Sequence, residues 1–206
     1  MYWRTNLNSF SEPRPAPRRT LRKPRRSAMI ALLCVLVAVC AFFALRGVLK
    51  TLYPLRYEKD VEIGCQTQGL EKSFVLAVIK CESGFDPHAV SNVGARGLMQ
   101  LMPETFDWLQ SKTGDSYTED DLFEPAVNVR YGCYLLRILL TEFSGEQDTA
   151  VAAYHAGIGN VSKWLQDEDK SADGRTLRRI PFGSTAAYVK KVKKVQRIYA
   201  ALYDLD

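Results

Sequence analysis

The chain has 206 residues, which allows one domain of ordinary size with appendages and excludes two large domains. Its net charge of +5 is concentrated in residues 1–27, which hold eight basic side chains and one acid, so that 20 of the 28 Lys and Arg and 22 of the 23 Asp and Glu remain for the rest of the chain. A slightly acidic body argues against nucleic-acid binding, and two histidines without a C-x-x-C motif argue against a metal site; we expect neither a metal nor a cofactor.

Residues 1–27 form a basic tail that is rich in Pro and Arg and poor in apolar residues. This composition predicts a disordered segment, and its charge suits contact with anionic lipid head groups.

An uncharged apolar run follows the tail, from Ser27 to Leu45. About 18 helical residues at roughly 1.5 Å each reach about 27 Å, close to the thickness of a bilayer core, so we predict a transmembrane helix over residues 28–49. Because Lys and Arg crowd its N-terminal side, the positive-inside rule places the tail in the cytoplasm and the rest of the chain on the extracytoplasmic side of the membrane.

Two alternatives to the single-pass anchor were weighed. A cleaved signal peptide would have a shorter apolar region followed by an A-x-A-like site, and no such site follows the run. A lipoprotein site at Cys40 would need a small residue before it, where Val39 stands. The pattern therefore favours an anchor.

Three cysteines fall in the exported part, where disulfides are permitted. Cys65, Cys81 and Cys133 allow one bridge among three pairings, and the sequence does not choose among them.

After a stem at residues 50–60, the periodicity of apolar residues predicts helices and almost no strands. We expect helices near 57–66, 70–82, 103–112, 125–143, 149–154 and 159–166, and a C-terminal helix that carries Tyr188 and Leu202. The fold class is therefore all-α, with a single domain over residues 61–206.

Glu82, in the stretch "IKCESGFDP", is the most informative acidic residue. On a helix it shares a face with three apolar residues, Val75, Val78 and Ile79. A carboxylate on such a face is desolvated, which raises its pKa toward neutrality, as a general acid requires. Taken by itself, Glu82 could also be a helix-end residue that reaches water.

Three later stretches carry further candidates. "SNVGARGLMQLMPET" places the amide of Gln100 among Leu and Met residues that include Met99, a composition that suits a sugar ring with N-acetyl groups, although such Met residues also occur in cores. "AVAAYHAGIGNV" contains Tyr154 and His155, and "IPFGSTAAYVKKV" contains Tyr188.

In this order the motifs resemble the lytic transglycosylases of the soluble-lytic-transglycosylase type, glycoside hydrolase family 23, which share a lysozyme-like fold with goose-type lysozyme. The resemblance covers roughly residues 61–202. It rests on "ES" at 82–83, "GLMQLMP" at 97–103, "NVRYGCYL" at 128–135, "AYHAG" at 153–157 and "IPF" at 180–182 with "YV" at 188–189.

The resemblance implies cleavage of the β-1,4 bond between N-acetylmuramic acid and N-acetylglucosamine in peptidoglycan, with formation of a 1,6-anhydro sugar. Glu82 would be the single catalytic residue, first as the acid that protonates the glycosidic oxygen and then as the base that accepts the proton of the muramoyl C6 hydroxyl. Ordinary glycosidases use two carboxylates, and no second acid occupies a matched position.

The resemblance also implies that Ser83, Met99, Gln100, Tyr154 and His155 bind the glycan, together with Tyr188, which would lie close to the catalytic acid.

The sequence departs from the family pattern in two places. His155 stands where the family usually has Asn, and the usual Glu-Thr-Arg reads Ser184-Thr185-Ala186, so its acid and its Arg are lost. His155 can still donate a hydrogen bond, so we expect activity. The alternatives are a hydrolase of the same fold that admits water and a catalytically weak glycan-binding scaffold. Machinery for wall synthesis, secretion or sporulation is the expected class of protein partner.

Overall fold

The computed structural model describes residues 25–205, so the predicted tail lies almost wholly outside the described residues. The chain divides into two compact units, the first ending at Ala44 and the second beginning at Leu45. No strand occurs among the described residues, which contain only two isolated β-bridges. The prediction of an all-α fold is confirmed.

Helix α1 (Arg25–Leu52) carries the apolar run expected to span a membrane. Its residues Arg26–Leu52 are long and apolar enough to do so. Within the first unit its large apolar side chains are exposed, including Leu32 at 70% and Phe43 at 66%. A helix that functions in water would bury such side chains, whereas lipid would cover them.

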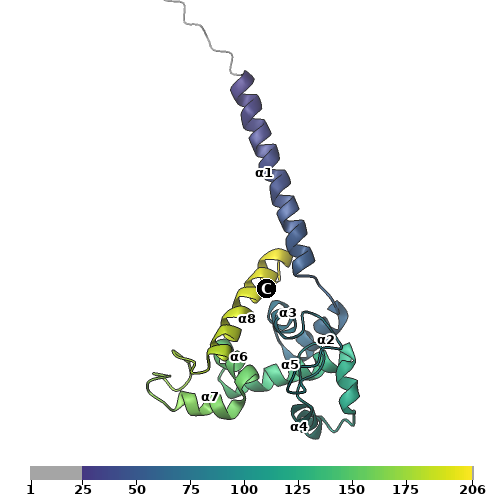
Figure 1. Cartoon of the computed structure of the whole chain (residues 1–206), viewed down its shortest axis with the longest axis vertical. Helices are drawn as coiled ribbons and strands as arrows, with labels where there is room; N and C mark the ends of the chain where they lie inside the picture. The colour runs from purple at the N-terminus through teal and green to yellow at the C-terminus, as the bar shows by residue number, and fades with distance from the viewer. Residues whose placement is uncertain (1–24, 206) are drawn as a thin grey trace, which may run out of the picture. The chain divides into compact units, whose positions relative to one another are not determined.

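The second unit contains seven α-helices and one short 3₁₀ helix in its described part (Figure 1). They are α2 (Glu58–Gln68), α3 (Lys72–Glu82), α4 (Pro103–Thr113), η1 (Glu119–Phe123), α5 (Pro125–Glu142), α6 (Gln147–Ala156), α7 (Ile158–Leu165) and α8 (Gly183–Tyr203). All the helices expected from periodicity are present, while η1 was not predicted.

Local sequence explains where α4 begins and ends. Pro103 occupies its first turn, where a missing N–H has no cost. The helix ends at Gly114, whose φ of +76° is in the left-handed region that glycine adopts readily.

Helix α3 is the central helix of the second unit. Every residue from Ser73 to Ile79 is buried, and α3 packs against α2 and most extensively against α8, which lies beside it in Figure 1. A helix that is apolar on all sides belongs inside a core. Glu82 is the last residue of this helix, so its position is fixed by the best-packed element of the fold.

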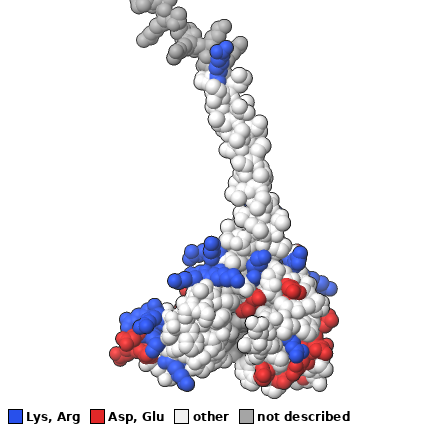
Figure 2. All heavy atoms as spheres, viewed as in Figure 1, with Lys and Arg blue, Asp and Glu red and all other residues white. Residues whose placement is uncertain are grey.

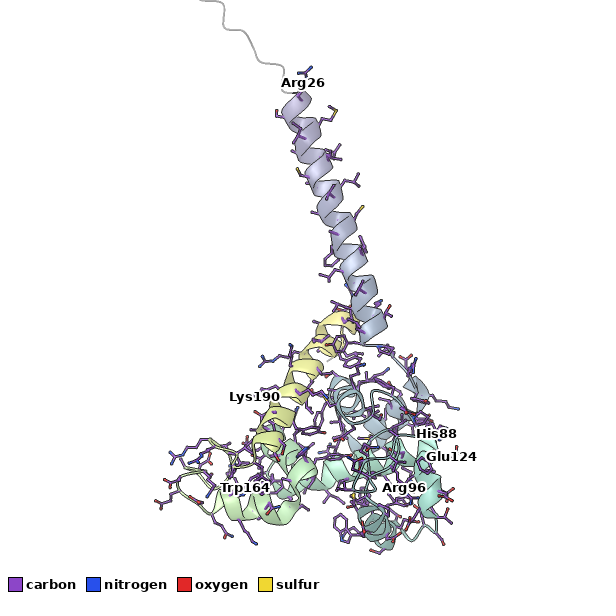
Figure 3. The ribbon with its side chains drawn as sticks, viewed as in Figure 1. Arg26, His88, Arg96, Glu124, Trp164 and Lys190 are labelled. Carbon is purple, nitrogen blue, oxygen red and sulfur yellow. The ribbon has the colours of Figure 1, made fainter. Side chains whose placement is uncertain are left out.

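The loop between α3 and α4 is held by paired backbone and by one arginine. Arg96 forms β-bridges with Val90 and Leu101. Its guanidinium pairs with the Glu119 carboxylate at 2.9 Å and lies 5.7 Å from the ring centre of Phe123, on the side of the second unit where Figure 3 labels Arg96 and Glu124. The long loop is therefore tied to η1.

Helix α8 has one buried and one basic side. Val192, Val195 and Tyr199 face the core, while Lys190 and Lys194 are exposed. Figure 2 shows basic side chains gathered over this helix within the second unit. The basic side follows from the solvent position of an amphipathic helix.

Candidate active site

The site forms where the C-terminal end of α3 meets the first turns of α8. The Tyr188 hydroxyl donates a hydrogen bond to Glu82 Oε1 at 2.5 Å. Tyr188 is 9% exposed and Glu82 is half-buried, so the bond is partly shielded from water.

The environment of Glu82 favours its protonated form. Burial on the face it shares with Val78 and Ile79 raises the pKa of Glu82 to about 6, against the lowering effects of the Tyr188 hydrogen bond and of the Lys191 charge. The prediction that desolvation raises the pKa of Glu82 is therefore confirmed. A carboxyl group with this pKa can hold a proton near neutral pH and release it in a reaction.

Ser83 joins the end of α3 to the loop that follows. Its hydroxyl donates to the Leu98 carbonyl at 2.8 Å and accepts from the Phe85 N–H at 3.1 Å. The hydroxyl is thus engaged with main chain, and its evident effect is to fix Glu82 relative to residues 97–102.

Tyr154 holds the same loop from the side of α6. Its hydroxyl donates to the Met99 carbonyl at 2.6 Å, and burial raises the pKa of Tyr154 well above its usual value. The ring is therefore a neutral hydrogen-bond donor next to Glu82, whose charge contributes to that shift.

Gln100 adopts a left-handed conformation, with a φ of +49°. Its side-chain N–H₂ donates to the Ala89 and Gly97 carbonyls, both at 3.0 Å. These bonds leave the amide oxygen as the group available to a ligand.

The side chain of Met99, which the resemblance places among the glycan-binding residues, is not exposed to a ligand. Met99 is 0% exposed and fills the space above Gly132, where a Cβ atom would collide with the Met99 sulfur. The side chain belongs to the core, because α5 presents a residue without a side chain directly opposite. Only the Met99 main chain reaches the site, through its bond to Tyr154.

Asn128, which the sequence analysis placed in a motif but not in the site, is the internal anchor of this loop. It is 0% exposed, accepts from Met99 N–H at 2.7 Å, and donates to the Arg96 and Leu122 carbonyls at 3.0 and 2.7 Å. Gly97 must lack a side chain because a Cβ would collide with this amide. The signal in the sequence was an amide on the apolar face of a predicted helix.

His155 and Thr185 form a second layer behind Tyr188. The His155 ring lies 4.7 Å from the Tyr188 ring, centre to centre, at an interplanar angle of 33°. Its Nδ1 is 3.0 Å from the Thr185 hydroxyl, and burial lowers the pKa of His155. Thr185 was not predicted as a site residue, although it stands at the Thr position of the family's Glu-Thr-Arg pattern.

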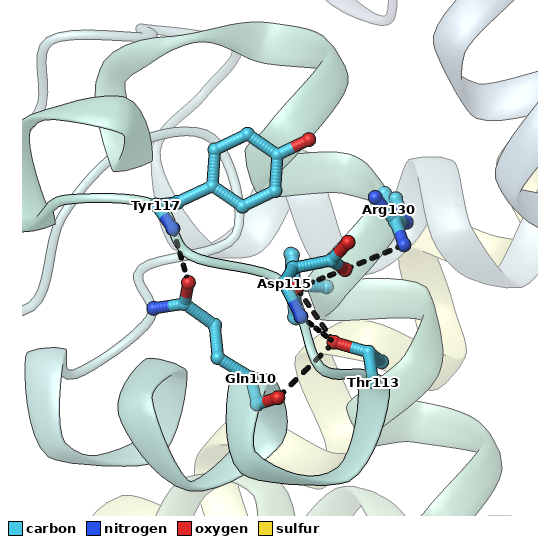
Figure 4. A network of polar contacts seen from close by, with 6 residues as sticks. Gln110, Thr113, Asp115, Tyr117 and Arg130 are labelled. Carbon is cyan, nitrogen blue, oxygen red and sulfur yellow. Dashed lines mark hydrogen bonds and ion pairs between the residues drawn. The ribbon is translucent and has the colours of Figure 1, made fainter.

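A separate polar network closes the connection between α4 and η1 (Figure 4). Asp115 accepts from Arg130 at 2.7 Å and from Tyr131 at 2.6 Å, and Gln110 accepts from the Tyr117 N–H at 2.5 Å. Because the polar groups of this network hydrogen-bond one another, we interpret the network as a structural connection.

A pocket of about 510 Å³ between α2 and α5 is lined by residues such as Ile63 and Tyr134 and includes none of the predicted site residues.

The sequence allowed one disulfide among three cysteines without choosing a pair. In the structure Cys65, Cys81 and Cys133 are unpaired thiols.

The fold and the site together define a lysozyme-like helical domain in which one carboxyl group with a raised pKa ends the central helix. The chain belongs to the Transglycosylase SLT domain family, whose sequence pattern matches residues 61–176.

Curated relatives agree with this assignment. The chain is 33% identical to the putative soluble lytic murein transglycosylase of Haemophilus influenzae over 74% of its length, and 29% identical to the membrane-bound lytic murein transglycosylase C of Glaesserella parasuis over 70%. It spans 26% of the first protein and 46% of the second, so it corresponds to part of each.

A solved structure has the same fold. An inactive mutant of the lytic transglycosylase Slt from Pseudomonas aeruginosa, in which a glutamate is replaced by glutamine, superposes with a TM-score of 0.67 at 33% identity, covering 76% of this chain and 26% of that one.

Proposed function

We propose that the protein is a membrane-anchored peptidoglycan lytic transglycosylase. It would cleave the β-1,4 bond between N-acetylmuramic acid and N-acetylglucosamine and leave 1,6-anhydromuramic acid ends. The observation that carries the proposal is the protonatable Glu82 at the end of a buried helix, with Tyr188 as its hydrogen-bond donor.

In the proposed reaction, protonated Glu82 gives its proton to the glycosidic oxygen as the bond to C1 breaks. The Glu82 carboxylate then accepts the proton of the C6 hydroxyl while that oxygen bonds to C1. The acid is regenerated and no water is consumed. A single group suffices, because one carboxyl serves in turn as acid and base.

Substrate contacts are proposed for the groups that surround this acid. The Gln100 amide oxygen is available to polar groups of the glycan, whereas Ser83 and Tyr154 would act mainly by fixing the loop main chain. Met99 would contribute to the site only through its main chain, whose carbonyl accepts the hydrogen bond from Tyr154.

The test is digestion of purified walls by the full chain in detergent, with mass spectrometry of the released muropeptides. Wild type should release anhydro products that are lighter by one water than hydrolysed ones. Glu82→Gln should lower release by about a hundredfold or more, since general acid catalysis commonly contributes that much. Glu142→Gln, at an exposed position on α5, is the matched control and should behave as wild type.

Each other outcome has a distinct meaning. Hydrated ends alone would indicate a hydrolase in place of a lyase. Equal release by wild type and Glu82→Gln, or release by neither, would remove the catalytic proposal and favour a glycan-binding scaffold.

We also propose a single-pass topology with residues 1–27 in the cytoplasm and the second unit outside. The apolar α1 and the basic residues before it support this orientation. External protease on spheroplasts should remove a C-terminal tag and spare an N-terminal one, and loss of both or neither would contradict the orientation. Partners in wall synthesis, secretion or sporulation would be reached from this position.

A further inference from the structure

His155 is the side chain near the site whose position the proposed reaction leaves unexplained. It lies in the last turn of α6, is exposed, and does not contact Glu82 through any hydrogen bond. Its two described contacts are the Tyr188 ring and the Thr185 hydroxyl.

Both contacts of His155 are with side chains of one turn of α8. Thr185 is 1% exposed and precedes Tyr188 by three residues, so both side chains project from neighbouring positions on one side of α8. The hydrogen bond to Thr185 fixes the imidazole plane, and the imidazole covers the Tyr188 ring at 4.7 Å. The imidazole thereby restricts rotation of the Tyr188 ring.

The orientation of that ring matters because the Tyr188 hydroxyl reaches Glu82 at 2.5 Å. Hydrogen bonds weaken steeply as distance and angle depart from their optimum. A small rotation of an unsupported ring would lengthen or misalign this bond.

We propose that His155 is a positioning residue that acts through Tyr188: it holds the tyrosine hydroxyl against the carboxyl group of Glu82. This inference rests on the proposed function only for its effect on catalysis, because the arrangement of the three side chains is independent of the substrate.

The first test is a double-mutant cycle on kcat and KM, measured with soluble uncross-linked glycan strands and the full chain in detergent. His155→Ala should lower kcat by about five- to tenfold with little change in KM, because the lost contact supports the acid rather than the substrate. In the Tyr188→Phe background, which lacks the hydroxyl, the same change should have less than about a twofold effect.

Two variants serve as controls. His155→Phe keeps a ring against Tyr188 and should retain kcat within about threefold. His88→Ala changes the only other histidine, which lies in the α3–α4 loop beside Phe123, and should match wild type. Unfolding temperatures of all variants verify that the fold is intact.

The second test does not depend on activity. A ¹³C-NMR titration of the Glu82 carboxyl group should show a higher pKa in His155→Ala, as in Tyr188→Phe, because the tyrosine hydrogen bond lowers that pKa. Lys191, Tyr154 and Cys81, the other groups that interact with Glu82, are unchanged in these variants. His155→Phe removes the titratable imidazole but keeps a ring, so it should leave the pKa of Glu82 close to that of wild type.

The inference is overturned if the effects of His155→Ala and Tyr188→Phe multiply, if KM rises while kcat is unchanged, or if the Glu82 titration does not respond. Failure of the proposed function looks different: wild type and Glu82→Gln would then be equally inactive, while the titration would still decide the role of His155.

Discussion

The Tyr188 hydroxyl and the Glu82 carboxylate are joined at 2.5 Å although the two residues are 106 positions apart in the sequence. The contact links the end of α3 to α8, the pair of helices that pack most extensively in the second unit. The bond favours the ionised acid, while burial favours the protonated acid, and burial has the larger effect on the pKa of Glu82.

The balance of these two effects predicts how Tyr188→Phe changes the pH–rate profile. Because the hydrogen bond lowers the pKa of Glu82, its removal should raise that pKa and move the alkaline limb of kcat to higher pH. We also expect kcat at its optimum to fall about tenfold, since the carboxyl group loses its fixed orientation. An alkaline limb that stays in place or moves to lower pH would contradict the assigned effect of Tyr188.

The raised pKa of Glu82 also predicts a dependence of stability on pH. The folded state binds the proton more tightly than the unfolded state, whose reference pKa is 4.5, so the stabilisation is fully present below 4.5 and is lost as pH rises through about 6. Above that range Glu82→Gln should be more stable than wild type by up to about 2 kcal/mol, and below 4.5 the difference should diminish. Denaturant titrations across this range measure the difference. A variant that is less stable than wild type at every pH would contradict the buried-acid assignment.

Asn128 should be among the most sensitive positions for stability. Asn128→Ala would leave the Met99 N–H and the Leu122 carbonyl without the Asn128 amide and remove one of the two hydrogen bonds to the Arg96 carbonyl, at a cost of about 2–5 kcal/mol. Asn160→Ala is the control, because Asn160 is exposed and donates a single bond to Ala156. Thermal unfolding compares them, and equal losses for the two variants would show that Asn128 does not anchor the loop.

The variant Met99→Leu tests whether the Met99 side chain packs in the core or contacts the substrate. Met99→Leu conserves volume and should cost less than about 1.5 kcal/mol of stability. Because the side chain is 0% exposed, KM for soluble glycan strands should remain within about twofold of wild type. A several-fold rise in KM at unchanged stability would restore the substrate-binding role that the sequence suggested.

The local sequence was sufficient to predict the α-helices and the raised pKa of Glu82. The length of the apolar run predicted α1, and periodic apolar residues predicted the helices from α2 to α8, because burial of one face is a property of neighbouring residues. The apolar approach to Glu82 predicted its raised pKa for the same reason. The short η1 was not predicted, since its five residues are too few to establish a period.

Roles that depend on distant partners were decided only by tertiary structure. Met99 is a core residue because Gly132 of α5 leaves room for it, and Asn128 is an anchor because three groups from the α3–α4 loop and from η1 converge on its amide. His155 lies on Tyr188 because α6 and α8 pack together. The sequence by itself determined that Glu82 ends an apolar helix and that its pKa is raised. The packing of helices remote in sequence decided which side chains hold that residue in place, because those contacts join segments whose separation no local pattern encodes.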